Sequence, residues 1–483
     1  MHEGSPGIRR EERLALIAVS LGTLMVVIDG IAIGLSLPLI KTEFGLSQQD
    51  LVWVVNAFLV TYAGFQLLGG RLGDLFGHRR VFLCGLALFG ITSLCCGLAS
   101  SWGQLIGGRL LQGLAGTIIQ TVALPLLLNV LPKPEDRPIA LSMYGFVINS
   151  GATLGLLLSG TLTSLLGWRS IFLLNVPITA VVYILCKALL PRGPENKENQ
   201  PLDIAGAITI TASLSFAVLG IIQAGDIGWG SRQALTSVSS ALALSTVFLI
   251  IQARSSAPLV PLRIFRMPSL MICSLISALF SAALASGLFA SFYVQLVLGY
   301  TQLHASLVFA PSTLIMAAFS LHFSARFVTQ FGIKRPLLIS ILVVALGLVF
   351  LVRVPVHGSF GLDVFPGLLL FNLGAGAAGS ALFVGATRGV QTCDIGLASG
   401  VLGTAALMGG TLGLALLSSV ATTHSRRLVT SGVAPSLALT DGYHAAFLFG
   451  AIIAVIAAAF VVALPISNTP APSAAGRQMG TGR

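Results

Sequence analysis

Two charged side chains, those of Asp29 and Arg109, lie inside long apolar stretches of the sequence. Asp29 stands in MVVIDGIAIG, within the apolar segment 14–37 and without another charge nearby. A carboxylate at the centre of a membrane costs about 2.5 kcal/mol or more, so we expect Asp29 to face the protein interior and to be protonated part of the time. Such a group can load a proton on one side of a membrane and release it on the other. The alternative is a structural acid that hydrogen-bonds a neighbouring helix.

Arg109 is the second charge well inside an apolar segment, in the sequence RLLQGLAG. A buried guanidinium needs a carboxylate or several carbonyl oxygens as partners. On its own, this position is compatible with a structural role, in which Arg109 fixes its helix through backbone carbonyls. A role in proton coupling is the alternative.

A glycine-rich basic loop follows the second apolar segment. Its sequence GRLGDLFGHRR recurs in reduced form as ARFVTQFGIKR (residues 325–335), at the same place in the later half of the chain. Glycines let two helix ends approach closely, and Asp74 can accept hydrogen bonds from helix amides or arginine. We expect a latch that holds an outward-open state; the alternative is a basic loop that only sets the topology. The expected latch residues are Gly70, Arg71, Gly73, Asp74, Gly77, Arg79 and Arg80.

The composition of the chain indicates what surrounds these residues. Of 483 residues, 55% are hydrophobic and 9% are charged, whereas a soluble domain carries about 25% charged residues. Too few charges remain to cover a water-facing surface, so the lipid bilayer is the expected partner of most of the exterior. The net charge of +11 is spread over loops and forms no single patch, which argues against nucleic acid as a partner.

Fourteen apolar segments of spanning length predict an all-α membrane protein. The expected spans are 14–37, 50–70, 81–99, 103–130, 139–165, 171–190, 203–223, 234–253, 270–298, 304–330, 336–353, 361–386, 393–422 and 443–465. The polar linker PRGPENKENQP and a later basic connector bracket two spans that resemble neither flank. The expected fold is therefore two pseudo-symmetric six-helix bundles plus two inserted central helices. Many secondary transporters are built in this way from two similar halves.

The domain organisation and topology follow from these spans. The expected units are a cytoplasmic N-terminus (1–13), an N-terminal six-helix bundle (14–190), a cytoplasmic linker (191–202), two inserted helices (203–253), a cytoplasmic connector (254–269), a C-terminal six-helix bundle (270–465) and a disordered cytoplasmic tail (466–483). Most of the 27 lysines and arginines fall on one side, which predicts that both termini are cytoplasmic. The first apolar stretch is too long for a signal peptide, so we expect it to be retained.

Polar residues within the expected spans are candidates to line a substrate cavity. They are Asn56, Tyr62, Gln66, Gln120, Asn149, Gln295, His322 and Asn372. Each alone is better explained as a hydrogen bond between helices, worth about 0.6 kcal/mol. Together they would provide a few polar contacts in a large apolar cavity, as in promiscuous binding pockets.

No group of residues predicts an enzyme. The six cysteines have neither disulfide nor metal-ligand spacing, and no Ser/His/Asp grouping or phosphate-binding loop is recognisable. We expect no catalytic residue, no metal and no cofactor other than protons as the coupling ion, in a protein that works as a monomer. A membrane-bound sensor would need an output domain, and the polar tail is too short to be one.

Several of these motifs resemble those of a known family. GRLGDLFGHRR resembles the loop between the second and third helices of the major facilitator superfamily, and RLLQGLAG resembles its fourth-helix motif. WRSIFLLNVP (168–177), APLVPLRIFR (257–266) and QLVLGY (295–300) are similar to segments of its fourteen-span drug:H⁺ antiporters. The resemblance covers about residues 14–465. It implies alternating access and a role of Arg109 in proton coupling.

The fifth expected span resembles the antiport motif of this family. Gly151 and Gly155 are one helical turn apart and form a small-residue face for close packing, and Gly160 ends the motif. The sequence departs from the family in having Leu156 where a proline is expected.

A second departure lies in the thirteenth span, where Gly403, Ala406 and Leu407 replace polar residues of relatives. If this face lines the cavity, it favours hydrophobic substrates. We predict proton-coupled export of small hydrophobic or amphipathic compounds, such as drugs and antibiotics, from the cytoplasm or inner leaflet across a bacterial inner membrane. The alternative is a proton-independent facilitator or an uptake symporter of the same fold, which the missing proline favours slightly.

Overall fold

The computed structural model describes residues 9–131, 151, 154–190, 203–255, 258–260, 267–320, 325–388, 390 and 395–464. Within these ranges the chain consists of helices and their connections. Asn149, His322, the expected linker 191–202 and the expected tail 466–483 lie outside the described residues.

The described helices follow the expected order along the chain. The N-terminal part contains α1 (Arg10–Phe44), α2 (Gln48–Gly64), α3 (Gln66–Phe76), α4 (His78–Gly97), α5 (Trp102–Val130), the short helix Leu154–Leu166 and α7 (Arg169–Leu189). The inserted pair consists of α8 (Ile204–Ile227) and α9 (Arg232–Arg254). The C-terminal part contains α10 (Pro268–Leu284), α11 (Gly287–Phe292), a π-helical turn (Tyr293–Val297), α12 (Gln302–Phe319), α13 (Ala325–Phe331), α14 (Lys334–Leu351), a second π-helical turn (Phe360–Val364), α15 (Phe365–Thr387), α16 (Ile395–Thr430) and α17 (Pro435–Val462).

Twelve helical segments of the described chain are long and apolar enough to cross a membrane. A further span is added if α2 and α3, which are bent by 49° relative to each other, are counted as one. The expected span 139–165 is described only in part, by the helix Leu154–Leu166. The all-helical architecture is therefore confirmed, whereas a total of fourteen spans stays a prediction.

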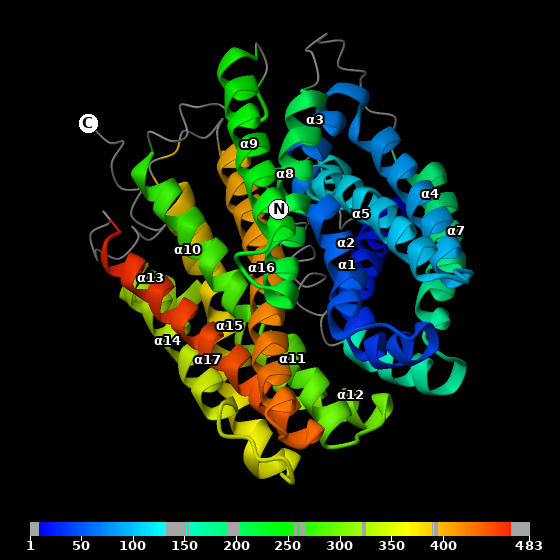
Figure 1. Ribbon diagram of the computed structural model, residues 1–483. Coiled ribbons are helices and arrows are strands. Elements are labelled where there is room, and N and C mark those ends of the chain that lie inside the picture. Colours follow the sequence, from blue (N-terminus) through cyan, green and yellow to red (C-terminus); the bar gives the residue numbers. More distant parts are fainter. Residues whose placement is uncertain are drawn as a thin grey trace.

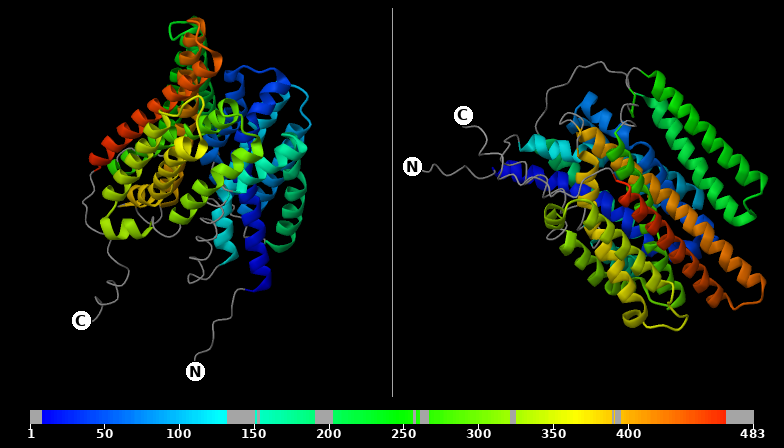
Figure 2. Two further views of the ribbon diagram at one scale, coloured as in Figure 1. Left: turned by 90° about the horizontal axis from the view of Figure 1, so that it is seen from below. Right: turned by 90° about the vertical axis from the view of Figure 1, so that its left-hand side faces the viewer.

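The two ends of the chain form separate groups of helices. Figure 1 shows α1 to α7 on one side and α10 to α17 on the other, and Figure 2 shows the α8–α9 pair along the edge of the molecule. α8 packs against both α2 and α16, and α9 packs on α8. Gly64 of α2 lies against Thr211 of α8, and Thr423 of α16 donates a hydrogen bond to the carbonyl of Gly225 at 2.7 Å. The inserted pair therefore contacts both halves.

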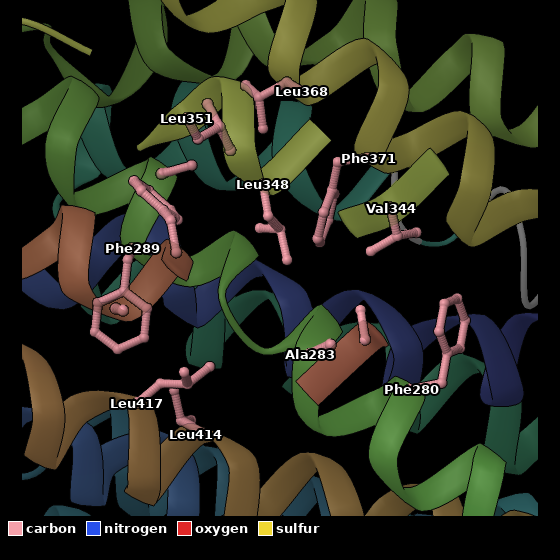
Figure 3. Close-up of a cluster of buried hydrophobic side chains, with 14 of the residues drawn as sticks. Phe280, Ala283, Phe289, Val344, Leu348, Leu351, Leu368, Phe371, Leu414 and Leu417 are labelled. Carbon is pink, nitrogen blue, oxygen red and sulfur yellow. The ribbon is translucent and has the colours of Figure 1, made fainter. Parts of the chain in front are cut away.

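Each half has an apolar core. In the N-terminal half, Phe82 and Phe89 of α4 are fully buried with Ile119 of α5 and Val182 of α7. A larger cluster lies mainly in the C-terminal half, where it includes Phe289 and Leu348 (Figure 3), and it extends to Ile33 and Phe172 of the N-terminal half. Large apolar side chains also cover much of the exterior, for example Ile184 and Leu242, each 65% exposed. An apolar exterior around a packed interior is what lipid requires of a helical bundle.

Several helices begin at a polar side chain that satisfies a free backbone amide. Ser47, Ser101, Ser231 and Thr301 each accept a hydrogen bond from the amide three residues further on. Such caps are worth about 1 kcal/mol each. They fix where α2, α5, α9 and α12 start.

α5 approaches α2 so closely that Gly113 has no room for a side chain. A Cβ atom there would overlap with the carbonyl oxygen of Phe58 and the hydroxyl of Thr61. We expect Gly113→Ala to lower the free energy of unfolding by about 1–3 kcal/mol, because backbone must move to relieve the overlap. Thermal unfolding in detergent measures this. Gly107→Ala on the same helix, where no atom lies within 4 Å, is the control; similar losses for both variants would contradict the prediction.

Candidate functional site

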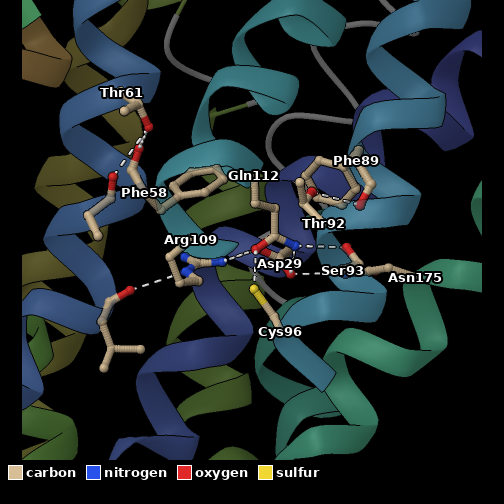
Figure 4. Close-up of polar contacts among 12 residues, drawn as sticks. Asp29, Phe58, Thr61, Phe89, Thr92, Ser93, Cys96, Arg109, Gln112 and Asn175 are labelled. Carbon is tan, nitrogen blue, oxygen red and sulfur yellow. Dashed lines mark hydrogen bonds and ion pairs between the residues drawn. The ribbon is translucent and has the colours of Figure 1, made fainter. Parts of the chain in front are cut away.

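Asp29 and Arg109 meet in the interior of the N-terminal half. Asp29 lies on α1 and Arg109 on α5, and the side chains are 1% and 0% exposed. Arg109 Nη1 donates to Asp29 Oδ2 at 2.6 Å, and the two form a buried ion pair (Figure 4). The two charges far apart in the sequence are thus each other's partner.

Two amides complete the hydrogen bonding of the Asp29 carboxylate. Gln112 Nε2 on α5 donates to Oδ1 at 3.1 Å, and Asn175 Nδ2 on α7 donates to the same oxygen at 2.9 Å. With Arg109, three donors point at one carboxylate. This arrangement suits the ionised form of Asp29, since an ionised carboxylate only accepts.

Arg109 is held from several sides as well. Its Nη1 also donates to Gln112 Oε1 at 2.7 Å, and its Nε donates to the carbonyl of Val54 on α2 at 3.1 Å. The Phe58 ring centroid lies 4.5 Å from the guanidinium carbon, a cation–π contact. Among the described residues, Arg109 Nη2 has no hydrogen-bond partner. Arg109 therefore has both a carboxylate and a backbone carbonyl as partners, and its role, structural or in proton coupling, stays a prediction.

Gln112 connects this pair to α4. Its Nε2 donates to Ser93 Oγ at 2.8 Å, and the Cys96 thiol lies 3.9 Å from its Oε1. Helices α1, α4, α5 and α7 thus converge on one buried polar cluster, defined by Asp29, Arg109, Gln112, Asn175 and Ser93, and α2 adds the Val54 carbonyl. We call these five residues the Asp29 cluster.

The chemistry available to the Asp29 cluster is a change of protonation. With Asp29 ionised, the ion pair is neutral overall and each charge has a partner. Adding a proton to Asp29 removes the negative charge and leaves the buried Arg109 cation uncompensated. An uncompensated charge in the membrane interior costs several kcal/mol, so the protonated state favours a rearrangement that gives Arg109 a new partner.

Sequence reasoning missed Gln112, Asn175 and Ser93. Gln112 lies in the RLLQGLAG motif and Asn175 in WRSIFLLNVP. The sequence therefore marked both segments but assigned no role to these two residues. The i, i+3 spacing of Arg109 and Gln112 on one helix face was the available signal. Asn175 could be placed only once α7 was known to lie beside α1.

The glycine series of the fifth span packs against α1. A Cβ at Gly151 would meet the side chain of Val27, and one at Gly155 would come within 3.2 Å of the carbonyl oxygen of Ile28. The helix that carries Asp29 is therefore closely packed on this side as well. The third glycine, Gly160, lies against Ser306 of α12 in the other half.

The expected latch residues lie at the α3–α4 turn. Asp74 is paired with His78 at 3.5 Å, and Arg79 donates to the carbonyl of Lys187 on α7 at 2.7 Å. Gly77 has φ +86°, which a side chain would strain, and a Cβ at Gly73 would meet Val122 of α5. Gly70 has open space around it, and Arg71 and Arg80 are on the same segment. These contacts are within the N-terminal half, and the latch role stays a prediction.

The candidate cavity residues Asn56, Gln66 and Gln295 have buried atoms without a hydrogen-bond partner among the described residues. Asn56 is fully buried, and neither its amide nitrogen nor its oxygen is paired. Gln66 Oε1 and Gln295 Oε1 are likewise unpaired. Gln295 Nε2 donates to Ser291 Oγ at 3.0 Å. These groups are suited to take a new partner in another state of the protein.

The other described candidates have ordinary packing roles. Tyr62 stacks on Phe58 with ring centroids 5.2 Å apart, and Asn372 donates to Ser312 Oγ at 3.0 Å. Gln120 is partly buried on α5. The structure brings none of them into the Asp29 cluster.

The apolar residues of the thirteenth span have two different surroundings. A Cβ at Gly403 would lie 3.3 Å from Gln66 Nε2, next to α3. Leu407 instead packs against the cluster that α8 forms with Val60 and Ala63. The apolar side chain of Leu407 therefore packs at the contact with the inserted helix α8.

Comparison with known proteins agrees with this architecture. Residues 19–414 match the Major Facilitator Superfamily. The chain is 33% identical to the cephamycin export protein CmcT of Amycolatopsis lactamdurans over 84% of each chain. It is 29% identical to the puromycin resistance protein pur8 of Streptomyces alboniger, over 95% of this chain and 93% of that protein. The tetracenomycin C resistance and export protein of Streptomyces glaucescens is 28% identical over 86% of this chain and 77% of its own.

A solved structure shows the same fold. A bacterial homologue of the human lysosomal transporter Spinster, in an inward-facing and unoccupied conformation, matches with a TM-score of 0.67 and 16% identity over 95% of this chain and 98% of that one. Members of the matched family are transporters rather than enzymes. The chain is a multi-pass membrane protein and belongs to the Major Facilitator Superfamily.

Proposed function

We propose that this protein exports small hydrophobic or amphipathic organic compounds, such as antibiotics, and that inward proton flow drives the export. The observation that carries the proposal is the buried Asp29–Arg109 ion pair, with 2.6 Å between Oδ2 and Nη1. A carboxylate kept in this position is the kind of group that marks proton pathways in membrane proteins. The names of the relatives, which are export and resistance proteins, support the substrate class.

Protonation of Asp29 couples to a change of conformation in this mechanism. The proton binds a carboxylate oxygen and weakens the bond to Arg109, which then depends on Gln112 Oε1 and the Val54 carbonyl. Because these two acceptors belong to α5 and α2, helix packing around Arg109 changes with the protonation state. Release of the proton restores the ion pair.

Alternating access requires that the halves part at one end and then at the other. Contacts made by glycines join the two halves at two places. Gly160 meets Ser306 near the start of α12, and Gly400 at the start of α16 lies against Leu67 of α3. Contacts of this type can separate without breaking ion pairs, and the latch residues of the α3–α4 turn would stabilise the outward-open state.

The energy of proton entry is sufficient for this work. One charge that moves down 100 mV yields about 2.3 kcal/mol, which sustains a gradient of roughly fifty-fold for a neutral substrate. Protons would be the coupling ion, and the mechanism uses no other cofactor.

The proposed setting is a bacterial inner membrane, crossed fourteen times by one monomer. The partly described segment that ends in the helix Leu154–Leu166 would supply the remaining span. Lysines and arginines gather in the loops on the side of the N-terminus, which supports cytoplasmic placement of both termini. A reporter that is active only in the cytoplasm should therefore be active when it is fused at residue 483.

The test is drug susceptibility of an efflux-deficient bacterium that expresses the chain. We expect higher tolerance to puromycin, tetracenomycin C or other hydrophobic and amphipathic antibiotics, and we expect a protonophore to remove the gain. Tolerance that persists with the protonophore would indicate a proton-independent facilitator. Increased sensitivity to the compounds would indicate uptake and would contradict the proposal.

A further inference from the structure

Asn175 is placed to respond to the protonation state of Asp29. It lies on α7, is 3% exposed, and donates from Nδ2 to Asp29 Oδ1 at 2.9 Å (Figure 4). This is the one hydrogen bond that its side chain makes with the described residues. Its backbone is held separately, because Thr179 Oγ1 donates to the Asn175 carbonyl at 2.6 Å. The amide can therefore turn without moving the helix.

Gln112, the other amide at the carboxylate, has no such freedom. Its Oε1 accepts from Arg109 at 2.7 Å, and its Nε2 donates both to Asp29 and to Ser93. Turning this amide would place an NH₂ group against the guanidinium cation. Gln112 is thus fixed in the orientation that the structure shows.

A protonated Asp29 needs an acceptor for its new O–H group. Arg109 presents only N–H groups, and Gln112 presents its Nε2 to this carboxyl. A buried hydroxyl without a partner costs about 1–3 kcal/mol. Turning the Asn175 amide by 180° exchanges its nitrogen for its oxygen, and the oxygen can accept the O–H.

We propose that Asn175 is a positioning residue for proton coupling, whose amide donates to the ionised Asp29 and, once turned, accepts the hydrogen bond of the protonated acid. The proposal rests on the proposed role of Asp29 as the proton carrier. The incoming proton forms one O–H bond on Asp29, Arg109 keeps its own protons, and no other bond is made or broken. Asn175 would stabilise both states of Asp29, because it offers a hydrogen-bond partner to each.

The titratable groups around Asp29 are few among the described residues. Arg109 faces it from α5, and the Cys96 thiol on α4 points to Gln112 Oε1. On α2, the Val54 carbonyl and the Phe58 ring contact Arg109, and neither group titrates. On α7 the contact is Asn175 itself. A pH-dependent change in this cluster therefore reports mainly on Asp29.

Infrared difference spectroscopy of the full chain in lipid tests the proposal directly. Protein labelled with ¹³C-asparagine would be titrated with acid, and the Asp29 band identified by its loss in Asp29→Asn. We expect an asparagine amide band to shift with the same pH midpoint as Asp29 and to be absent in Asn175→Leu. Titration of Asp29 without any such asparagine band, or a band that persists in Asn175→Leu, would overturn the proposal.

Asn372→Leu is the matched control for the infrared measurement. It removes a buried amide far from the site, bonded to Ser312, and should keep the asparagine band that shifts together with Asp29. Loss of that band in Asn372→Leu as well would count against the proposal. That outcome would leave the export function intact, whereas active export by Asp29→Asn would remove the carrier role and this proposal together.

Discussion

Asp29→Asn should abolish proton-driven export while the chain remains folded and inserted. Asparagine has the shape of aspartate and can turn its one amide oxygen toward Arg109 in place of Oδ2, so side-chain packing is kept, while the guanidinium loses its counter-charge as it does when Asp29 is protonated. Asparagine cannot bind and release a proton near neutral pH. The unmodified protein can sustain a substrate gradient of roughly fifty-fold at 100 mV, and Asp29→Asn should sustain none. Accumulation of a fluorescent substrate in cells measures this difference.

The control for this variant is Asp50→Asn. Asp50 is at the start of α2, where it completes the cap formed with Ser47, and asparagine caps nearly as well. Its export should match the unmodified protein at equal amounts in the membrane. Undiminished, protonophore-sensitive export by Asp29→Asn would remove Asp29 from the mechanism.

Arg109→Met should destabilise the N-terminal half more than any other single substitution considered. It leaves Asp29 buried without its counter-charge, and loss of one partner of a buried ion pair costs about 3–5 kcal/mol. We expect a large fall in thermal stability in detergent relative to the unmodified protein. Export should be abolished as well, because no cation remains whose partner changes when Asp29 binds a proton.

The double variant Asp29→Asn with Arg109→Met separates stability from coupling. Replacing both charges removes the uncompensated carboxylate, and apolar replacement of a buried pair is often neutral for stability. We expect the double variant to regain most of the stability lost in Arg109→Met and to remain inactive. A double variant as unstable as the single one would mean that Arg109 acts through the Val54 carbonyl rather than through Asp29.

Much of the fold was accessible from sequence because lipid imposes a simple rule on it. Long apolar segments must be helices, since no other local structure satisfies the backbone in hydrocarbon. The inserted pair was also recognisable, as two spans between polar connectors. Its packing was not, because the contact of Gly64 with Thr211 and of Gly225 with Ser419 depends on small residues that are common throughout the chain.

The candidate site was accessible only in part. Asp29 and Arg109 stand out because charge inside an apolar segment is costly. Their pairing did not follow from the sequence, since a lone charge does not say which helix lies opposite. Asn175 and Gln112 gave still less signal, because neutral amides in membrane helices are tolerated and usually link helices.

The most direct test of the account is a measurement of proton movement by the purified protein in proteoliposomes that contain a pH-sensitive dye. The liposomes hold a proton gradient, and substrate is added on the less acidic side. The substrate should accelerate dissipation of the gradient by the unmodified protein, and it should not change the rate of dissipation with Asp29→Asn. Substrate transport that moves no protons in the unmodified protein would contradict the central claim that Asp29 couples export to the proton gradient.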